Sequence, residues 1–219
     1  MAISRAGTAS SGIAASGATI PVQTGVVNGD LMLVFIKCVV VTTISPPSGW
    51  TQIYHVQNTA GAGMTHAAYY RIAASEPSSY TWSNSAAGSQ DYILAAYSGV
   101  NSTTPIDTSA SDLSGATTTV TAPAITTSYA NGMIVGCWCP RTGFSGAAPY
   151  CNAAFSTVNS ANGWSVADLP STATGGYGGW AASSTAPVAR WVAGSIALRV
   201  ADSQSVVPHL AAGYHWWAL

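Results

Sequence analysis

The groups of this sequence that could act as general acids and bases are seven carboxylates in a chain of 219 residues. Hydrolysis of a glycosidic bond needs two of them, placed on either side of that bond. Five of the seven stand beside turn signals, where a carboxylate commonly accepts hydrogen bonds from nearby backbone. We therefore expect them to fix turns and strand ends, and a polysaccharide-degrading enzyme is the weakest of three functional hypotheses. The seven are Asp30, Glu76, Asp91, Asp107, Asp112, Asp168 and Asp202.

The four histidines show none of the spacings that metal sites require. His55 and His66 can face each other across a predicted hairpin, and we interpret them as a surface or interface pair. The sequence also lacks a GxSxG nucleophile elbow, and the glycine run 175–179 lacks the lysine and helix of a phosphate loop. We therefore predict no catalytic residue, no cofactor and no metal. The histidines are His55, His66, His209 and His215.

Four cysteines lie within strand-like sequence. Cys137 and Cys139 are two residues apart, which places both thiols on one face of a strand. Two such thiols could be metal ligands, but no CxxC or His-x-x-x-His completes a zinc site. We expect buried free thiols, and a disulfide from Cys38 or Cys151 to this pair is the open alternative.

Aromatic side chains are the remaining groups that could bind a ligand, and the chain has eight Trp and ten Tyr. Trp164, Tyr177 and Trp180 lie in an irregular, glycine-rich region, where exposed rings can stack on sugar faces. These three are the candidate glycan contacts. The interpretation that we favour is that they close the ends of the domain or contact a neighbouring subunit.

A second aromatic cluster lies in residues 202–219, which show no strand alternation. Burial of its rings gives no more free energy than ordering this segment costs. We therefore predict an extended arm that needs further contacts with the chain's own domain or with another subunit. The predicted partner-interface residues are Leu210, Tyr214, His215, Trp216, Trp217 and Leu219.

The elements that must hold these residues are strands, because turn signals recur about every ten residues and helical periodicity is nearly absent. The segment 31–41 is apolar on both faces apart from Lys37, so it is either a central strand or a strand whose outer face meets another chain. The polar stretch 102–114 should cross between sheets. Further strands are expected at 16–23, 50–57, 64–73, 79–83, 91–100, 117–125, 132–139, 150–158, 163–167 and 189–200.

Composition limits the partners. Only 6% of the residues are charged, against about 25% in ordinary domains, and the net charge is −1. A chain so poor in charge is prone to associate, which favours a component of an assembly. Six basic residues against seven acidic ones exclude a basic nucleic-acid footprint. No apolar run approaches the ~18 residues of a membrane helix, and the N-terminus lacks the apolar segment of a secretory signal.

Several strand-turn motifs occur together in a familiar order. They are GDLMLVFI (29–36), PPSGWTQI (46–53), AAYYRIAASEPSSYTW (67–82), AAYSGVNSTTPID (95–107) and APAITTS (122–128). Together they resemble a β-sandwich module of bacteriophage virion proteins (head decoration, tail fibre) and of bacterial surface proteins. The resemblance covers about residues 3–201. It implies a jelly-roll, lectin-like sandwich, and it brings no catalytic residues with it.

We therefore expect an all-β chain with two parts: an antiparallel two-sheet β-sandwich of jelly-roll type (1–201) and a C-terminal extended arm (202–219). The expected function is that of a non-enzymatic bacteriophage virion structural protein. As a capsid decoration (cement) protein, a homo-oligomer such as a trimer would bind the major capsid protein or another virion protein and stabilise the head shell. Assembly would take place in the host cytoplasm, with no nucleic-acid or membrane partner. The alternative is a receptor- or glycan-binding module of a phage tail fibre or bacterial surface adhesin.

Overall fold

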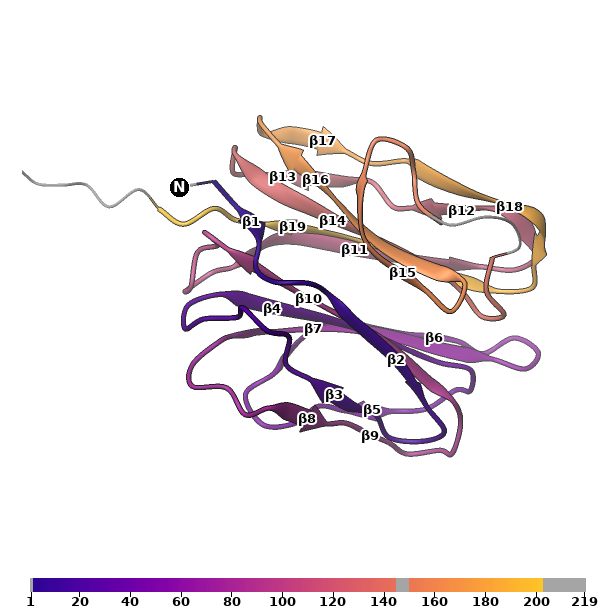
Figure 1. Ribbon diagram of the computed structural model, residues 1–219. Coiled ribbons are helices and arrows are strands. Elements are labelled where there is room, and N and C mark those ends of the chain that lie inside the picture. Colours follow the sequence, from indigo (N-terminus) through magenta and orange to yellow (C-terminus); the bar gives the residue numbers. More distant parts are fainter. Residues whose placement is uncertain (1, 145–149, 203–219) are drawn as a thin grey trace, which may run out of the picture.

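The computed structural model describes residues 2–144 and 150–202, and all regular secondary structure in these ranges is β-strand. Two large antiparallel sheets lie face to face (Figure 1). The first has the strand order β1-β10-β4-β7-β6, and β2 pairs with β10 on the same side as β1. Its strands are β1 (Ser4–Arg5), β2 (Ser10–Ala14), β4 (Leu31–Cys38), β6 (Thr51–Asn58), β7 (Met64–Ile72) and β10 (Gln90–Ser98).

The second large sheet has the order β11-β19-β14-β16-β15. Its edge strand β11 lies beside β6 of the first sheet, and its other edge strand β15 lies beside β2. The all-β sandwich predicted from the sequence is therefore confirmed. The strands of this sheet are β11 (Ile106–Ser114), β14 (Gly132–Pro140), β15 (Ser156–Ala161), β16 (Trp164–Ser171) and β19 (Trp191–Leu198).

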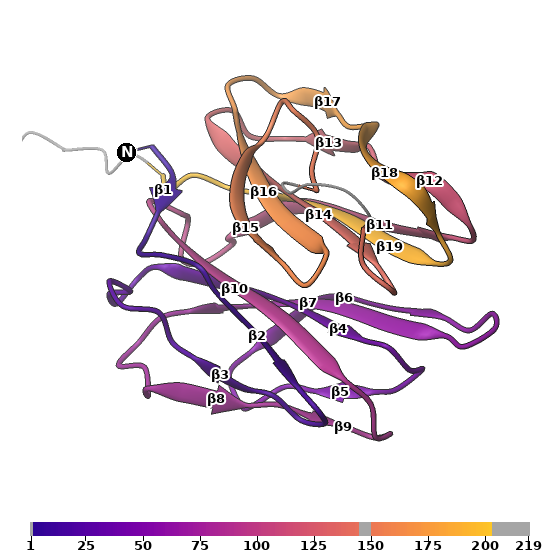
Figure 2. The ribbon, with the colours of Figure 1, turned by 45° about the vertical axis from the view of Figure 1, so that its right-hand side comes forward.

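Short two-stranded sheets cover the outer faces of both large sheets, so that the molecule has four layers (Figures 1 and 2). Apolar residues fill each interlayer space, which gives one central core and two outer cores. The covers of the first sheet are β3 (Thr19–Pro21) with β8 (Ser79–Thr81) and β5 (Ile44–Ser45) with β9 (Ser83–Asn84). Those of the second are β12 (Thr117–Ala122) with β18 (Trp180–Val188) and β13 (Ile125–Thr127) with β17 (Gly175–Tyr177).

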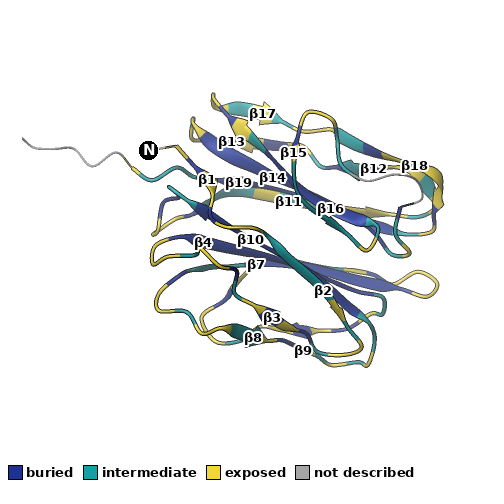
Figure 3. Ribbon diagram, viewed as in Figure 1, coloured by how far each residue is buried: buried dark blue, intermediate teal, exposed yellow. Residues whose placement is uncertain are grey.

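Strand β4 is central to the first sheet, because it pairs with β10 on one side and β7 on the other. All eight of its residues are buried (Figure 3). Side chains alternate along a strand, so Leu33 and Phe35 enter the central core while Val34 and Ile36 enter the outer core. The central-strand interpretation of this apolar run is confirmed, and its outer face is covered by this chain rather than by a partner.

The two halves of the chain repeat one topology. Strands β2, β10, β4, β7 and β6 take the same relative places as β11, β19, β14, β16 and β15. In each half a residue with positive φ, Gly29 or Asn131, turns the chain directly before the central strand. A Thr-x-Pro motif and an Asn-Gly pair precede the central strand in both halves. These shared motifs indicate the repeat in the sequence, whereas the strand patterns alone did not predict it.

The predicted jelly-roll path between the two large sheets is not observed. A single jelly roll would send successive strands back and forth between these sheets, whereas this chain finishes the first sheet at Ser98 before the second starts at Ile106. Strands alternate instead between each large sheet and its own cover. The crossing is shorter than predicted, because most of 102–114 is the nine-residue edge strand β11.

The strand predictions failed mainly where Ser, Thr, Gly and Ala dominate. Strands β2, β17 and β18 were not expected, and the strand predicted at 150–158 is found as β15, several residues later. In contrast, the strands rich in large apolar residues agree within a few residues. The predicted arm lies, apart from Asp202, outside the described residues. Its anchor is visible, because the Ala201 N–H donates to the Gly99 carbonyl at 2.8 Å.

Candidate functional site

Every lysine and arginine of the chain is engaged within the fold. Four of the six form ion pairs with carboxylates at N–O distances of 2.6–3.0 Å. Arg141 donates to the carbonyls of Gly63 and Val39 at 2.7 and 3.0 Å. Arg190 lies 3.5 Å from the side-chain oxygen of Asn58. The ion pairs are Arg5–Asp168, Lys37–Asp91, Arg71–Glu76 and Arg199–Asp202.

Like the basic residues, the carboxylates all have partners within the chain. The three that form no ion pair accept backbone N–H groups, and one of these contacts, that of Asp30, lies within a turn. Asp30 accepts from Val27 at 2.9 Å, and Asp107 accepts from Ser128 at 2.7 Å. Asp112 accepts from the next residue along the chain at 2.8 Å. All seven carboxylates thus have structural partners within the chain.

The Arg5–Asp168 pair ties the N-terminal strand to the second half of the chain. Arg5 on β1 donates from Nε and Nη2 to the two oxygens of Asp168 on β16, both at 2.7 Å. The Tyr97 hydroxyl donates to the same carboxylate at 3.2 Å. Arg5 also reaches the carbonyls of Ser156 and Thr157 on β15. A bidentate guanidinium–carboxylate contact fixes geometry as well as charge. The Arg5–Asp168 contact, called the clamp below, therefore fixes β1 of the first sheet against β16 of the second.

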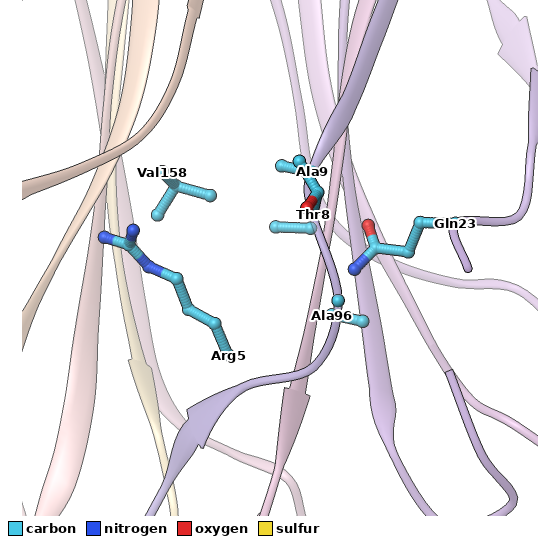
Figure 4. Close-up of a pocket in the computed structure, with 8 residues that line it drawn as sticks. Arg5, Thr8, Ala9, Gln23, Ala96 and Val158 are labelled. Carbon is cyan, nitrogen blue, oxygen red and sulfur yellow. The ribbon is translucent and has the colours of Figure 1, made fainter. Parts of the chain in front are cut away.

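A pocket of about 180 Å³ opens beside the clamp. Figure 4 shows Arg5 and Val158 on one side of it, across from Thr8, Ala9 and Gln23. Two further surface pockets measure about 210 and 190 Å³. Each of the three is smaller than the clefts of about 300–1,000 Å³ that usually hold small ligands.

The candidate glycan residues do not form one exposed site. Trp164 is fully buried in the central core, with its ring 5.9 Å from that of His66, so it has no face open to a sugar. That part of the prediction is wrong, because position 164 begins a strand whose first side chain points inward. Trp180 is partly exposed and packs edge-on against Phe155 at 4.9 Å. Tyr177 is also partly exposed, and its hydroxyl donates to the Ala173 carbonyl at 2.9 Å.

The two histidines of the β6–β7 hairpin point to opposite faces, which corrects the predicted pair. His55 lies opposite Ala67, whereas His66 lies opposite Val56 and enters the central core. His66 Nε2 lies 3.5 Å from Cys137 Sγ. Burial lowers the pKa of His66 to about 3, and the charge of Lys37 adds to this shift. The ring is therefore neutral at physiological pH.

All four cysteines are free thiols, so the disulfide alternative does not apply. Cys137 and Cys139 both face the central core, as their spacing predicts, while Cys38 faces the outer core. Burial raises the pKa of Cys139 to about 12, which keeps the thiol protonated. Within 2–144 and 150–202, no three histidine, cysteine or acidic side chains gather in a way that could hold a metal ion.

Comparisons of the chain with protein-family models, with curated proteins and with solved structures found no match. The described part of the chain contains no helix with the length and apolar character needed to cross a membrane.

Proposed function

We propose that this chain is a non-enzymatic structural protein of a bacteriophage particle, acting as a head-decoration protein that stabilises the shell by contact. The observation that carries this proposal is the use of the charged side chains. All thirteen charged residues, six basic and seven acidic, are engaged within the fold. Acid–base catalysis needs such groups within reach of a substrate, and here they hold strands and loops together.

The architecture also suits a protein whose stabilising function depends on a rigid structure. Three separate cores hold four layers together, and the Arg5–Asp168 clamp ties the first half of the chain to the second. A surface with few charges is weakly protected against association, and copies bound side by side on a shell would cover it. The virion-like sequence motifs support the phage assignment.

The segment 203–219, with its interface residues Leu210, Tyr214, His215, Trp216, Trp217 and Leu219, is the proposed contact with a neighbouring subunit or the capsid. It continues from a fixed point, because Asp202 accepts hydrogen bonds from Asn101 at 3.0 Å and from Arg199 at 2.7 Å. We expect a variant that ends at Asp202 to keep the folded sandwich but to lose binding to undecorated heads in a sedimentation assay. Normal binding by this variant would remove the arm from the proposal.

The second candidate function is glycan binding by a tail fibre or surface adhesin. Trp180 and Tyr177 favour it, because both residues remain partly exposed beside Gly178 and Gly179, whose positive φ angles glycine adopts readily. Under this alternative, Trp180→Ala weakens binding to a glycan array, whereas Tyr129→Ala, at an exposed ring elsewhere, does not. Absence of binding by the wild type would eliminate the alternative.

A further inference from the structure

Lys37 is the sole lysine of the sequence, and it lies in the interior of the molecule. It occupies the central strand β4 and is 3% exposed. Its cross-strand neighbour on β10 is Asp91, which is 4% exposed. The Lys37 Nζ atom lies 2.6 Å from Asp91 Oδ2. The Lys37 amine is therefore in contact with a carboxyl oxygen of Asp91, and that oxygen is bonded directly to the carboxyl carbon Cγ.

The surroundings of this pair are poor in other polar partners. Lys37 Nζ also lies 5.9 Å from the centre of the Trp164 ring, and Asp91 Oδ1 receives a long hydrogen bond of 3.4 Å from Ser89. A buried ion pair seldom increases stability. Removing two charges from water costs more free energy than their mutual attraction supplies, unless further hydrogen bonds support the pair. Condensation of the two groups would remove both charges from the interior.

We propose that Lys37 and Asp91 condense to an intramolecular isopeptide bond. The Nζ–Cγ bond forms, and the bond between Cγ and one carboxyl oxygen breaks. That oxygen leaves as water with one proton from the amine and one from the carboxyl group. No electrons are transferred, so the reaction needs no oxidant or other co-reactant. Fixing the two groups in contact supplies the orientation that such a condensation lacks in solution.

His66 is the second polar residue beside Lys37 in the sheet. It is the cross-strand neighbour of Lys37 on the side opposite Asp91, and all three residues are buried. The Nδ1 atom of His66 has no hydrogen-bond partner in the described part of the chain, and the ring is neutral because burial lowers its pKa. A neutral His66 brings no second positive charge that would compete with Lys37 for the Asp91 carboxyl group.

The bond would join two adjacent strands of the first sheet at one end of the central core. It would close a covalent loop that contains β5 to β9, including the covers β8 and β9. Such a link acts as a disulfide does, by limiting the unfolded chain, but it resists reduction. This inference is independent of the proposed function, because the bond can be present or absent in a protein of any activity.

The test is the intact mass of the purified wild-type protein, denatured and reduced. We expect a mass lower by one water, about 18 Da, than the sequence requires. Trypsin should yield peptides 6–71 and 72–141 as one branched species, because cleavage after Lys37 is blocked. An amine-reactive reagent should label no lysine side chain in the denatured protein. Asp168→Asn, which alters the ion pair with Arg5, should retain the loss of one water.

Lys37→Met should restore the full mass expected for its own sequence, whereas His66→Phe, which keeps an uncharged ring beside Lys37, should retain the loss of one water. If either variant fails to fold, the wild-type measurement still decides. A wild type with the full sequence mass and a reactive Lys37 amine would overturn the proposal. Loss of water without the branched peptide would also overturn it, since that result indicates a cyclic imide or dehydration elsewhere.

Discussion

Replacement of Arg5 by Leu should measure how strongly the clamp between the two halves is coupled to folding. The substitution removes both donors to Asp168, whose side chain is 6% exposed, and leaves Tyr97 as a remaining donor. Removing one partner of a fully buried ion pair costs about 3–5 kcal/mol. Because the Arg5 side chain is 36% exposed, solvent screening reduces this cost, and we expect about 2 kcal/mol.

Urea unfolding followed by tryptophan fluorescence measures this change directly. For a chain of this size, a loss of about 2 kcal/mol corresponds to a melting temperature lower by roughly 4–8 °C. The matched control is Asp202→Asn, which alters the exposed partner of Arg199 and should leave the midpoint unchanged. Equal unfolding midpoints for Arg5→Leu and the wild type would refute the clamp.

Three further substitutions or treatments test the interior. Burial lowers the pKa of His66 to about 3 from its ordinary value of 6.5, so the unfolded state takes up its proton first and stability falls as pH drops from about 6.5 towards 3. His66→Phe should flatten this decline, by up to about 1.4 kcal/mol per pH unit, in urea titrations across that range. Trp164→Ala should cost about 3–5 kcal/mol in the same assay, because it empties a fully buried site. A thiol reagent should label at most Cys151 in the native protein, since the other three cysteines are buried, and all four cysteines in denaturant. Fast labelling of more than one thiol in the native protein would contradict the packing.

Sequence patterns predict the strands of this fold where large side chains alternate or fill both faces. The run at 31–41 identifies a central strand because burial on both faces requires apolar residues throughout. Strands β11 and β18 escape detection since an edge or cover strand can be built from Ser, Thr and Ala. The jelly-roll type, which the family resemblance implied, is not confirmed, and strand patterns could not test it because alternation shows which faces are apolar and not which strands pair.

Contacts between buried side chains are harder to predict, because cross-strand register decides which side chains meet. Lys37 interrupts an apolar run, and nothing local to it indicates Asp91 as its partner. Trp164 looks exposed in glycine-rich sequence, yet the register of β16 directs it inward. Asp30 is an exception, since its contact with the backbone of Val27 lies within one turn and can be predicted from neighbouring residues.

The measurement that most directly tests the proposed function is cryo-electron microscopy of the phage particles that, under this proposal, contain the chain. We expect density for the two stacked sheets at regular positions on the outside of the head, with contacts between copies and to the major capsid protein. Density confined to tail fibres would favour the glycan-binding alternative. Absence of the chain from purified particles would contradict the proposal.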